Sequence, residues 1–385
     1  MKQLLSILFT IITLVSFAQK PAAEEPEKFV NLLENKKIGL TGNHTTLSGS
    51  EHLLDVLLAN NINVVKLYAP EHGFRGTAGA GEVVDNTKDE KTGISIISLY
   101  GNNKKPTKEN LKDIDCMVFD IQDVGTRFYT YLSTMHYVME ACAENNIPVV
   151  VLDRPNPNGF YIDGAILDSV CKSFVGMHPI PVVHGMTLGE LALMINSEGW
   201  LENGIKCNIT VVPCVDYSHT SRYELPVRPS PNLPDMQSIY LYPTLCFFEG
   251  TPLSVGRGTE FPFKVFGHPS FKDNKKYPFS FTPKTSDGRI KPLLEGKICY
   301  GKDFRETNTA NVKEIDLALI IEAYNDYETK DSFFQNMFSL LSGNKVLQKQ
   351  IAEGKTPEEI RDSWQADLDV FKAKRKQYLL YPDFY

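Results

Sequence analysis

The chain of 385 residues is 42% hydrophobic and 23% charged, which is the composition of an ordinary folded protein. Disordered, collagen-like and coiled-coil chains are excluded, and the length predicts two or three domains. The 40 basic and 47 acidic side chains give a net charge of -7. Because no run of five basic residues occurs, we expect no nucleic-acid partner.

The first 18 residues have the features of an export signal. Lys2 precedes an apolar run from Leu4 to Phe17, and Ser16 and Ala18 are small residues of the kind that a signal peptidase recognises. The run is shorter than the roughly 20 apolar residues that span a bilayer. We therefore expect cleavage after Ala18 and a mature protein that is periplasmic or extracellular, with no stable membrane insertion.

The seven cysteines show neither a disulfide framework nor a zinc pattern. No CxxC pair occurs, and the cysteines fall in predicted strands or helices. We expect them to be buried as small hydrophobic side chains, and the odd number leaves at least one unpaired.

From Lys36 to about residue 215, short β-branched runs alternate with helical patterns, as in a parallel α/β sheet. Helices are predicted around residues 128–142 and after a capping box formed by Thr187 and Glu190. These units predict a Rossmann-like, doubly wound parallel sheet, whose functional crevice lies at the carboxyl ends of the strands. The predicted strands are 37–41, 63–68, 94–99, 116–121, 148–152 and 207–214.

The later part of the chain predicts a second, smaller α+β domain. Residues 217–262 are rich in Pro and Gly and are interpreted as ordered loops at a domain border. Beyond them, helical patterns occur at residues 316–324 and from a capping box at Thr356 to Phe371. The predicted organisation is a signal peptide (1–18), an N-terminal linker (19–35), a Rossmann-like α/β catalytic domain (36–215), interdomain loops lining the cleft (216–262) and an α+β C-terminal domain (263–385).

Polar residues follow four of the predicted strands, at 42–44, 70–73, 120–123 and 153–158. Each group taken alone is explained by helix capping, turn formation or an ordinary polar side chain. Because the carboxyl ends of parallel strands meet at one edge of a sheet, their repetition indicates a polar active-site crevice.

Glu71 is the sharpest single candidate in this crevice. Pro70 and Gly73 predict a tight turn around it, and Phe74 could lower the local dielectric constant. A desolvated carboxyl group titrates higher and can stay protonated to act as an acid. On local sequence alone, a capping role or an ion pair with Arg75 is equally expected.

Two arginines near the strand ends have both structural and functional interpretations. Arg127 either belongs to the crevice or forms a salt bridge with Asp120 or Asp123. Arg154 offers a planar fork for a substrate carboxylate, although a buried pair with Asp153 explains it equally well.

Other chemistries have weaker support in the sequence. Neither GxGxxG after the first strand nor GxxxxGK[ST] occurs, and a GxSxG elbow is missing, so a dinucleotide, a P-loop nucleotide and a serine nucleophile are not expected. HExxH is also absent. We expect no metal and no other cofactor, with a zinc site of His44, His72, His184 and two or three carboxylates as the alternative.

Seven segments occur along the chain in a fixed order: LYAPEHGFRG, SLYG followed by KPT, VFDIQDVGTRFYTY, VLDRPNP, HGMTLGELA, PSPNLP and FFEGTPLSVGRGTEFPF. Together they resemble a bacterial family formerly known only as a domain of unknown function. The resemblance runs from about Ile38 to the C-terminus and is strongest up to Pro262. The characterised members of this family are exo-β-N-acetylmuramidases of the NamZ type.

This resemblance implies removal of terminal N-acetylmuramic acid from the non-reducing end of peptidoglycan fragments. It implies a Rossmann-like domain whose cleft is completed by a smaller C-terminal domain. The catalytic Glu of the family's PEHG motif corresponds to Glu71. The sequence departs from the family at residues 39–46, GLTGNHTT, where relatives more often have a Val-Thr-Asn-His-Thr-Gly run.

Glycoside hydrolysis usually needs an acid and a second carboxylate, or the substrate's own acetamido group as nucleophile. Asp123 is the favoured second group, ahead of Asp120, Asp153, Glu82 and Glu260. The lactyl carboxylate of muramic acid needs a cationic fork, for which Arg154 and Arg257 are the candidates. The remaining substrate-binding candidates are Asn43, His44, His72, Arg75, Asp120, Arg127, Tyr129, Asp153, Asn156, Asn232 and Glu260.

Two functions of other classes stay open at this point. A metal-dependent hydrolase of cell-wall amides or esters would use His44, His72 and Asp120. A non-catalytic cell-wall sugar-binding protein would keep the crevice but lose nothing when Glu71 is replaced.

Overall fold

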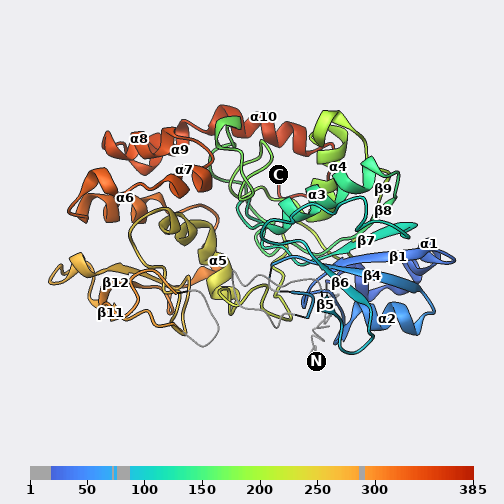
Figure 1. Cartoon of the computed structure of the whole chain (residues 1–385). Coiled ribbons are helices and arrows are strands. Elements are labelled where there is room, and N and C mark those ends of the chain that lie inside the picture. Colours follow the sequence, from blue (N-terminus) through green and yellow to red (C-terminus); the bar gives the residue numbers. More distant parts are fainter. Residues whose placement is uncertain (1–18, 72, 76–86, 286–290) are drawn as a thin grey trace, which may run out of the picture.

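The computed structural model describes residues 19–71, 73–75, 87–285 and 291–385. These residues form a seven-stranded sheet with helices on both faces and a smaller part with a three-stranded sheet (Figure 1). Among them no helix combines the length and the apolar character needed to span a bilayer. The predicted signal peptide lies outside the described residues.

The large sheet has the strand order β5-β6-β4-β1-β7-β8-β9. Six strands are parallel, and numbered along the chain they run 3-2-1-4-5-6, which is the order of the Rossmann fold. This confirms the predicted fold class. The parallel strands are β1 (Lys37–Gly42), β4 (Asn63–Ala69), β6 (Ser95–Ser98), β7 (Cys116–Asp120), β8 (Val149–Leu152) and β9 (Ile209–Val212), with β5 (Thr87–Lys88) antiparallel at one edge.

Alternating residues of the central strands are buried on opposite faces of the sheet. In β7, Met117 and Phe119 pack with α3 (Tyr131–Glu144) and α4 (Leu188–Ser197), whereas Val118 packs with α2 (Leu53–Ala59). Figure 1 shows these helices on the two sides of the sheet. Burial on both faces explains why the strands read as continuous apolar runs. A short hairpin, β2 (Leu47–Ser48) and β3 (Glu51–His52), leads into α2.

The predicted N-terminal linker (19–35) is wrong. The segment folds into η1 (Ala22–Glu24), η2 (Pro26–Lys28) and α1 (Val30–Leu33). Phe29 and Leu33 are 0% exposed in the core on the α2 side of the sheet. The backbone N–H of Ala22 also donates to the carbonyl of Asp153, with N···O 2.9 Å. The segment is therefore part of the Rossmann-like domain.

The smaller part follows α5 (Met236–Leu245) and η5 (Cys246–Gly250). Its antiparallel sheet has the order β10 (Val265–His268), β12 (Cys299–Asp303) and β11 (Phe279–Phe281). One helix is predicted from Thr356 to Phe371, but the structure has two helices there. They are separated near Ser363, whose hydroxyl donates a hydrogen bond to the Ile360 carbonyl one turn earlier. The helices are α6 (Leu317–Asp326), α7 (Asn336–Ser342), α8 (Val346–Ala352), α9 (Pro357–Asp362) and α10 (Gln365–Arg375), and the remaining short turns are η3 (Ser169–Cys171), η4 (Glu202–Gly204), η6 (Pro269–Phe271), η7 (Thr309–Asn311) and η8 (Lys330–Ser332).

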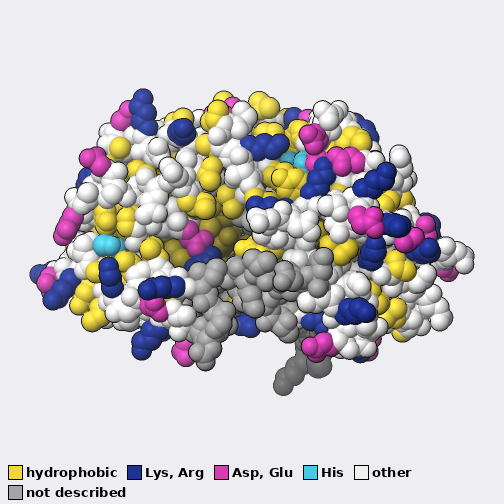
Figure 2. All heavy atoms as spheres, in the orientation of Figure 1, with side chains coloured by type: hydrophobic (Ala, Val, Ile, Leu, Met, Phe, Trp, Pro, Cys, Tyr) yellow, Lys and Arg dark blue, Asp and Glu magenta, His cyan; other side chains and the backbone are white. Residues whose placement is uncertain are grey.

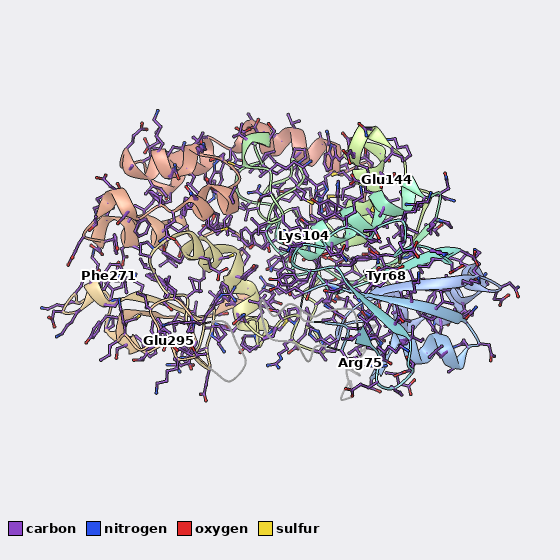
Figure 3. The ribbon with its side chains drawn as sticks, viewed as in Figure 1. Tyr68, Arg75, Lys104, Glu144, Phe271 and Glu295 are labelled. Carbon is purple, nitrogen blue, oxygen red and sulfur yellow. The ribbon has the colours of Figure 1, made fainter. Side chains whose placement is uncertain are left out.

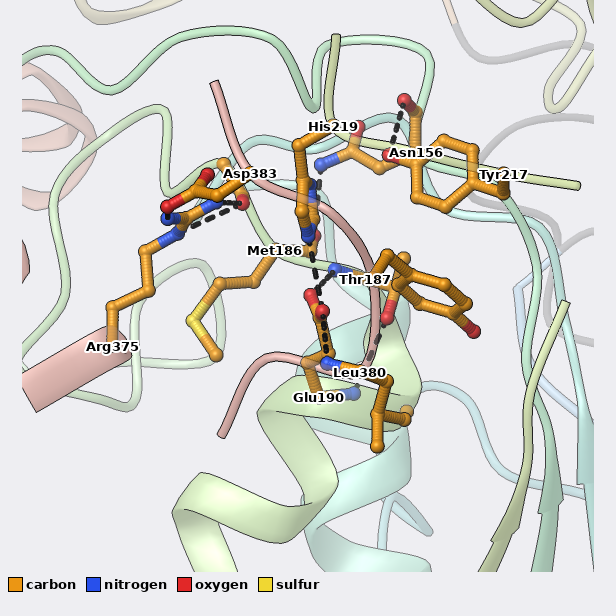
Figure 4. A network of polar contacts seen from close by, with 12 residues as sticks. Asn156, Met186, Thr187, Glu190, Tyr217, His219, Arg375, Leu380 and Asp383 are labelled. Carbon is orange, nitrogen blue, oxygen red and sulfur yellow. Dashed lines mark hydrogen bonds and ion pairs between the residues drawn. The ribbon is translucent and has the colours of Figure 1, made fainter. Parts of the chain in front are cut away.

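The C-terminal end of the chain returns to the Rossmann-like domain. Helix α10 runs back toward α4 in Figure 1, and Arg375 at its end donates to the Gly185 carbonyl at 2.6 and 3.0 Å. The Leu380 N–H donates to the Glu190 carboxylate at 2.9 Å, and the buried His219 ring contacts the same carboxylate at 3.0 Å (Figure 4). The last residues of the predicted 263–385 domain thus pack on the first domain.

All seven cysteines lie within the described residues, where they are buried with free thiols. This confirms their prediction as small hydrophobic side chains. Burial raises the pKa of Cys116 to about 11 and that of Cys207 and Cys299 to about 12, so these groups remain neutral thiols at physiological pH.

Candidate active site

A cavity of about 170 Å³ lies between the Rossmann-like domain and the smaller part. The face seen in Figure 2 is hollowed near its middle, with hydrophobic side chains at the bottom and charged side chains at the edge. Both parts of the chain supply the walls. The described lining residues are Glu71, Phe128, Tyr129, Thr130, Tyr131, Val175, Ser230, Asn232, Leu233, Tyr242, Glu249, Arg257 and Phe263.

Glu71 reaches the cavity from a tight turn directly after β4. The turn is closed by the Gly73 N–H, which donates to the Pro70 carbonyl at 3.2 Å, and Gly73 has a φ of 76°. Burial, with the charge and hydrogen bond of the Glu71 carboxylate, raises the pKa of Tyr100 to about 12. Arg75, which the sequence offered as a partner of Glu71, lies beside the sheet (Figure 3) and donates to Asp89 at 2.6 and 3.0 Å.

Buried polar atoms without a hydrogen-bond partner among the described residues gather at the carboxyl ends of β1 and β7. They include Gln122 Oε1, Asp123 Oδ1 and Thr126 Oγ1. Strands β1 and β7 are neighbours at the point where the strand order reverses, which is where doubly wound sheets bind their ligands. Since buried polar groups nearly always have partners, these atoms mark a place for a polar ligand or for water.

Asp123 lies close to the cavity wall and is 6% exposed. One carboxylate oxygen accepts from the Gly125 N–H at 2.6 Å, and the other has no partner among the described residues. Burial raises the pKa of Asp123 to about 7, although the N–H groups of Gly125 and Val124 oppose the shift. Tyr129, which lines the cavity, has a pKa raised by burial and also by the negative charge of Asp123. The two side chains are therefore close to each other.

Arg257 and Asn232, both predicted as substrate-binding residues, line the same cavity as Glu71. The cavity also includes Glu249, which the sequence interpretation missed although it lies in the FFEGTPLSVGRG segment together with Arg257. Glu260, from the same segment, is exposed and does not belong to the described wall.

Arg154 does not line the described cavity wall. Its Nε and Nη2 donate to the Asp120 carboxylate at 2.5 and 2.8 Å, and Nη2 also donates to the Leu47 carbonyl at 2.7 Å. Asp153, predicted as the alternative partner, instead accepts from the hydroxyls of Thr187 and Tyr381, both at 2.6 Å. Arg154, Asp120 and Asp153 thus hold the strand ends in place beneath the site.

Arg127 and Asn156 also have structural partners. The Arg127 guanidinium donates to the carbonyls of Ala165, Ile180 and Leu341 at 2.7, 2.7 and 3.0 Å, not to Asp120 or Asp123 as the sequence suggested. It is 1% exposed, and burial lowers its pKa to about 9. Asn156 Nδ2 donates to the Met186 carbonyl at 2.8 Å.

The alternative metal ligands are only partly brought together. His44 Nε2 contacts the Arg228 carbonyl at 2.8 Å, and burial lowers the pKa of the ring. Asp120 is engaged by Arg154, and His72, like Glu82, lies outside the described residues. Within the described ranges, the carboxylate group with metal-like spacing is Glu140, Glu144 and Glu202, which does not line the cavity.

The sheet has the strand order of the Rossmann fold, and a cavity with carboxylate side chains lies beside its switch point, the place where the strand order reverses. These features define an α/β enzyme that acts on a small polar ligand. Family models described as exo-beta-N-acetylmuramidase NamZ, N-terminal and C-terminal, match residues 38–237 and 240–381. The chain belongs to this family of glycosidases, which confirms the resemblance seen in the sequence.

Individual relatives agree with this assignment. The peptidoglycan beta-N-acetylmuramidase NamZ of Bacillus subtilis (strain 168) is 40% identical over 376 residues, covering 91% of this chain and 88% of its own. A crystal structure of a DUF1343 family protein from Bacteroides fragilis is 47% identical, with a TM-score of 0.88 over 95% of this chain and 100% of its own. A second one from that organism is 34% identical, with a TM-score of 0.79 over 94% of this chain and 99% of its own.

Proposed function

We propose that the protein is an exo-acting glycoside hydrolase that releases terminal N-acetylmuramic acid from the non-reducing end of peptidoglycan fragments, with Glu71 as its catalytic carboxyl group. One observation carries the proposal: Glu71 lies in a cavity beside the sheet's switch point, where buried polar atoms lack partners. The family of the chain supports the same reaction.

Glu71 acts as the acid that donates a proton to the glycosidic oxygen as the C1–O bond breaks. Water finally supplies the hydroxyl group at C1, and its proton restores the acid. Asp123, with an unpartnered oxygen close to the wall, supports the role of a second carboxyl group. The substrate's acetamido group is the alternative nucleophile.

The remaining walls fit a single sugar ring. Phe128, Tyr129 and Tyr131 give apolar ring surface together with hydroxyl groups, a combination that suits the mixed faces of a saccharide. Arg257 supplies a cation for the lactyl carboxylate, whereas Arg154 is already paired with Asp120. The cavity volume of about 170 Å³ is smaller than a typical drug-sized site of roughly 300 Å³ or more, which favours the end of a glycan over its middle.

Export of the protein, proposed from residues 1–18, would bring the enzyme to a substrate outside the cytoplasm. Sequencing the N-terminus of the protein recovered from the growth medium or periplasm tests this. A mature chain beginning at Gln19 supports export, and an intact Met1 in the cytoplasmic fraction contradicts it.

The activity is tested with two disaccharides of opposite order. Purified protein is incubated with N-acetylmuramyl-N-acetylglucosamine and with N-acetylglucosaminyl-N-acetylmuramic acid, and the released sugars are identified by mass. Release of N-acetylmuramic acid from the first alone supports the proposal. Cleavage of the second, or of neither, contradicts it.

A further inference from the structure

The cavity holds an arginine whose position is fixed by the surrounding chain. Arg257 lies between Gly256 and Gly258, both with a φ of 80°, a backbone region that favours glycine. A Cβ on Gly256 would come within 2.7 Å of Val265, and one on Gly258 within 2.6 Å of the Lys284 carbonyl oxygen. The loop therefore presents Arg257 from a closely packed turn.

Glu249 fixes the other end of the Arg257 side chain. The Arg257 Nε donates a short hydrogen bond to Glu249 Oε1, and the guanidinium lies over the Phe263 ring with its carbon 5.1 Å from the ring centre. Burial opposes the positive charge, but the adjacent Glu249 carboxylate outweighs it and raises the pKa of Arg257. Glu249 itself is placed on η5, where its second oxygen faces the Cys246 thiol at 3.8 Å.

This arrangement leaves one edge of the guanidinium available. Glu249 engages Nε, and among the described residues no hydrogen bond from Nη1 or Nη2 of Arg257 is made. The Arg257 side chain is 37% exposed and that of Glu249 is 26% exposed, so the pair remains open to a ligand. The two Nη groups of an arginine can bind both oxygens of one carboxylate.

We propose that Glu249 is a specificity-determining positioning residue, which holds Arg257 so that its Nη edge binds the carboxylate of a carboxylated sugar. This inference rests on the proposed function and goes beyond it, because it assigns the discrimination between muramic acid and glucosamine to the Glu249–Arg257 pair. N-acetylglucosamine has no lactyl carboxylate, so it gains nothing from the pair.

The test measures binding of free sugars by calorimetry and does not require turnover. We expect Glu249→Ala to weaken binding of N-acetylmuramic acid by about tenfold, the effect of losing roughly one charge-assisted hydrogen bond, and to leave binding of N-acetylglucosamine unchanged. Glu249→Gln should restore most of the affinity, because its amide oxygen still accepts from Nε. The control Asp303→Ala removes a comparable acidic partner of an arginine, Arg305, outside the cavity and should bind both sugars as the wild type does.

Three results would overturn the proposal: equal weakening for both sugars, no change for either, or tighter binding of N-acetylmuramic acid by Glu249→Ala. If the alanine variant does not fold, Glu249→Asp gives the same test, because its shorter side chain withdraws the carboxylate from Nε. Wild-type affinity of that variant for N-acetylmuramic acid would also overturn it. A failure of the proposed hydrolysis appears separately, as wild-type protein that releases no sugar from the disaccharide.

Discussion

The guanidinium of Arg154 and the carboxylate of Asp120 form a buried bidentate pair, with Nε···Oδ1 2.5 Å and Nη2···Oδ2 2.8 Å. Arg154 is 5% exposed and Asp120 0%. The pair joins the ends of β7 and β8, directly beneath the strand-end loops that carry the site. A buried charge that loses its partner is costly, so this pair should matter more for folding than for substrate binding.

Arg154→Ala should therefore lower the free energy of unfolding by about 3 to 5 kcal/mol, the range for breaking a buried ion pair. Denaturant unfolding followed by circular dichroism measures the loss. Arg305→Ala, which breaks an exposed pair with Asp303, is the control and should cost about 1 kcal/mol or less. An Arg154→Ala protein of wild-type stability that binds N-acetylmuramic acid poorly would return Arg154 to substrate recognition.

Asp123 should make the stability of the protein depend on pH. Burial raises its pKa to about 7 in the folded protein, whereas an unfolded Asp titrates near 3.8. Its contribution to stability is therefore fully present below about pH 4 and is lost as the pH rises to about 7. Asp123→Asn does not titrate at this position, so only the wild type should lose stability as the pH rises from 4 to 7. The free energy of unfolding of the variant minus that of the wild type should therefore increase by a few kcal/mol, because each unit of pKa shift corresponds to about 1.4 kcal/mol. A difference that stays constant from pH 4 to 7 would show that Asp123 titrates normally.

The C-terminal segment should contribute to the stability of the first domain. The Tyr381 hydroxyl donates to Asp153 at 2.6 Å and accepts from the Cys214 N–H at 2.9 Å, and the residue is 8% exposed. Tyr381→Phe leaves the buried Cys214 N–H without its hydroxyl acceptor and removes one of the two hydroxyl donors to Asp153, and it should cost about 1 to 3 kcal/mol. Tyr378→Phe is the matched control, because its hydroxyl bonds to the less buried Glu198 and its loss should be smaller. Equal melting temperatures for the two variants would contradict this role.

Chelation should leave activity unchanged if the carboxyl groups act without a metal. Asp120, one ligand of the alternative zinc site, already has both oxygens engaged by Arg154. Protein dialysed against EDTA should release N-acetylmuramic acid from the disaccharide at the rate of untreated protein. Loss of the activity that zinc or calcium restores, together with a stoichiometric bound ion, would favour a metal-dependent mechanism instead.

The sheet could be predicted from the sequence because the central strands β1, β7 and β8 are short, mainly apolar runs that are buried on both faces. Thr187 and Glu190 also mark a helix start through local contacts. Glu71 could be predicted because the adjacent residues Pro70 and Gly73 favour the tight turn in which it lies. These signals involve residues close together in the sequence, so they can be recognised without the structure.

Partners from distant parts of the chain could not be predicted in this way. Arg154 pairs with Asp120, 34 positions away, and Arg127 reaches Leu341, 214 positions away. Glu249 was missed because a lone Glu in a Gly- and Pro-rich segment gives no sign of the cavity it faces. Residues 19–35 resemble a linker in sequence because their buried side chains lie on short turns with no helical period.

The central claim is that Glu71 is the catalytic carboxyl group, and the most direct test is the turnover of N-acetylmuramyl-N-acetylglucosamine by Glu71→Gln. The amide keeps the volume of the side chain and its hydrogen-bonding capacity but cannot donate the proton that the leaving oxygen needs. We predict that the variant folds and binds N-acetylmuramic acid as the wild type does, and that its turnover falls by about 10²-fold or more. Wild-type turnover by a folded Glu71→Gln protein would contradict the account.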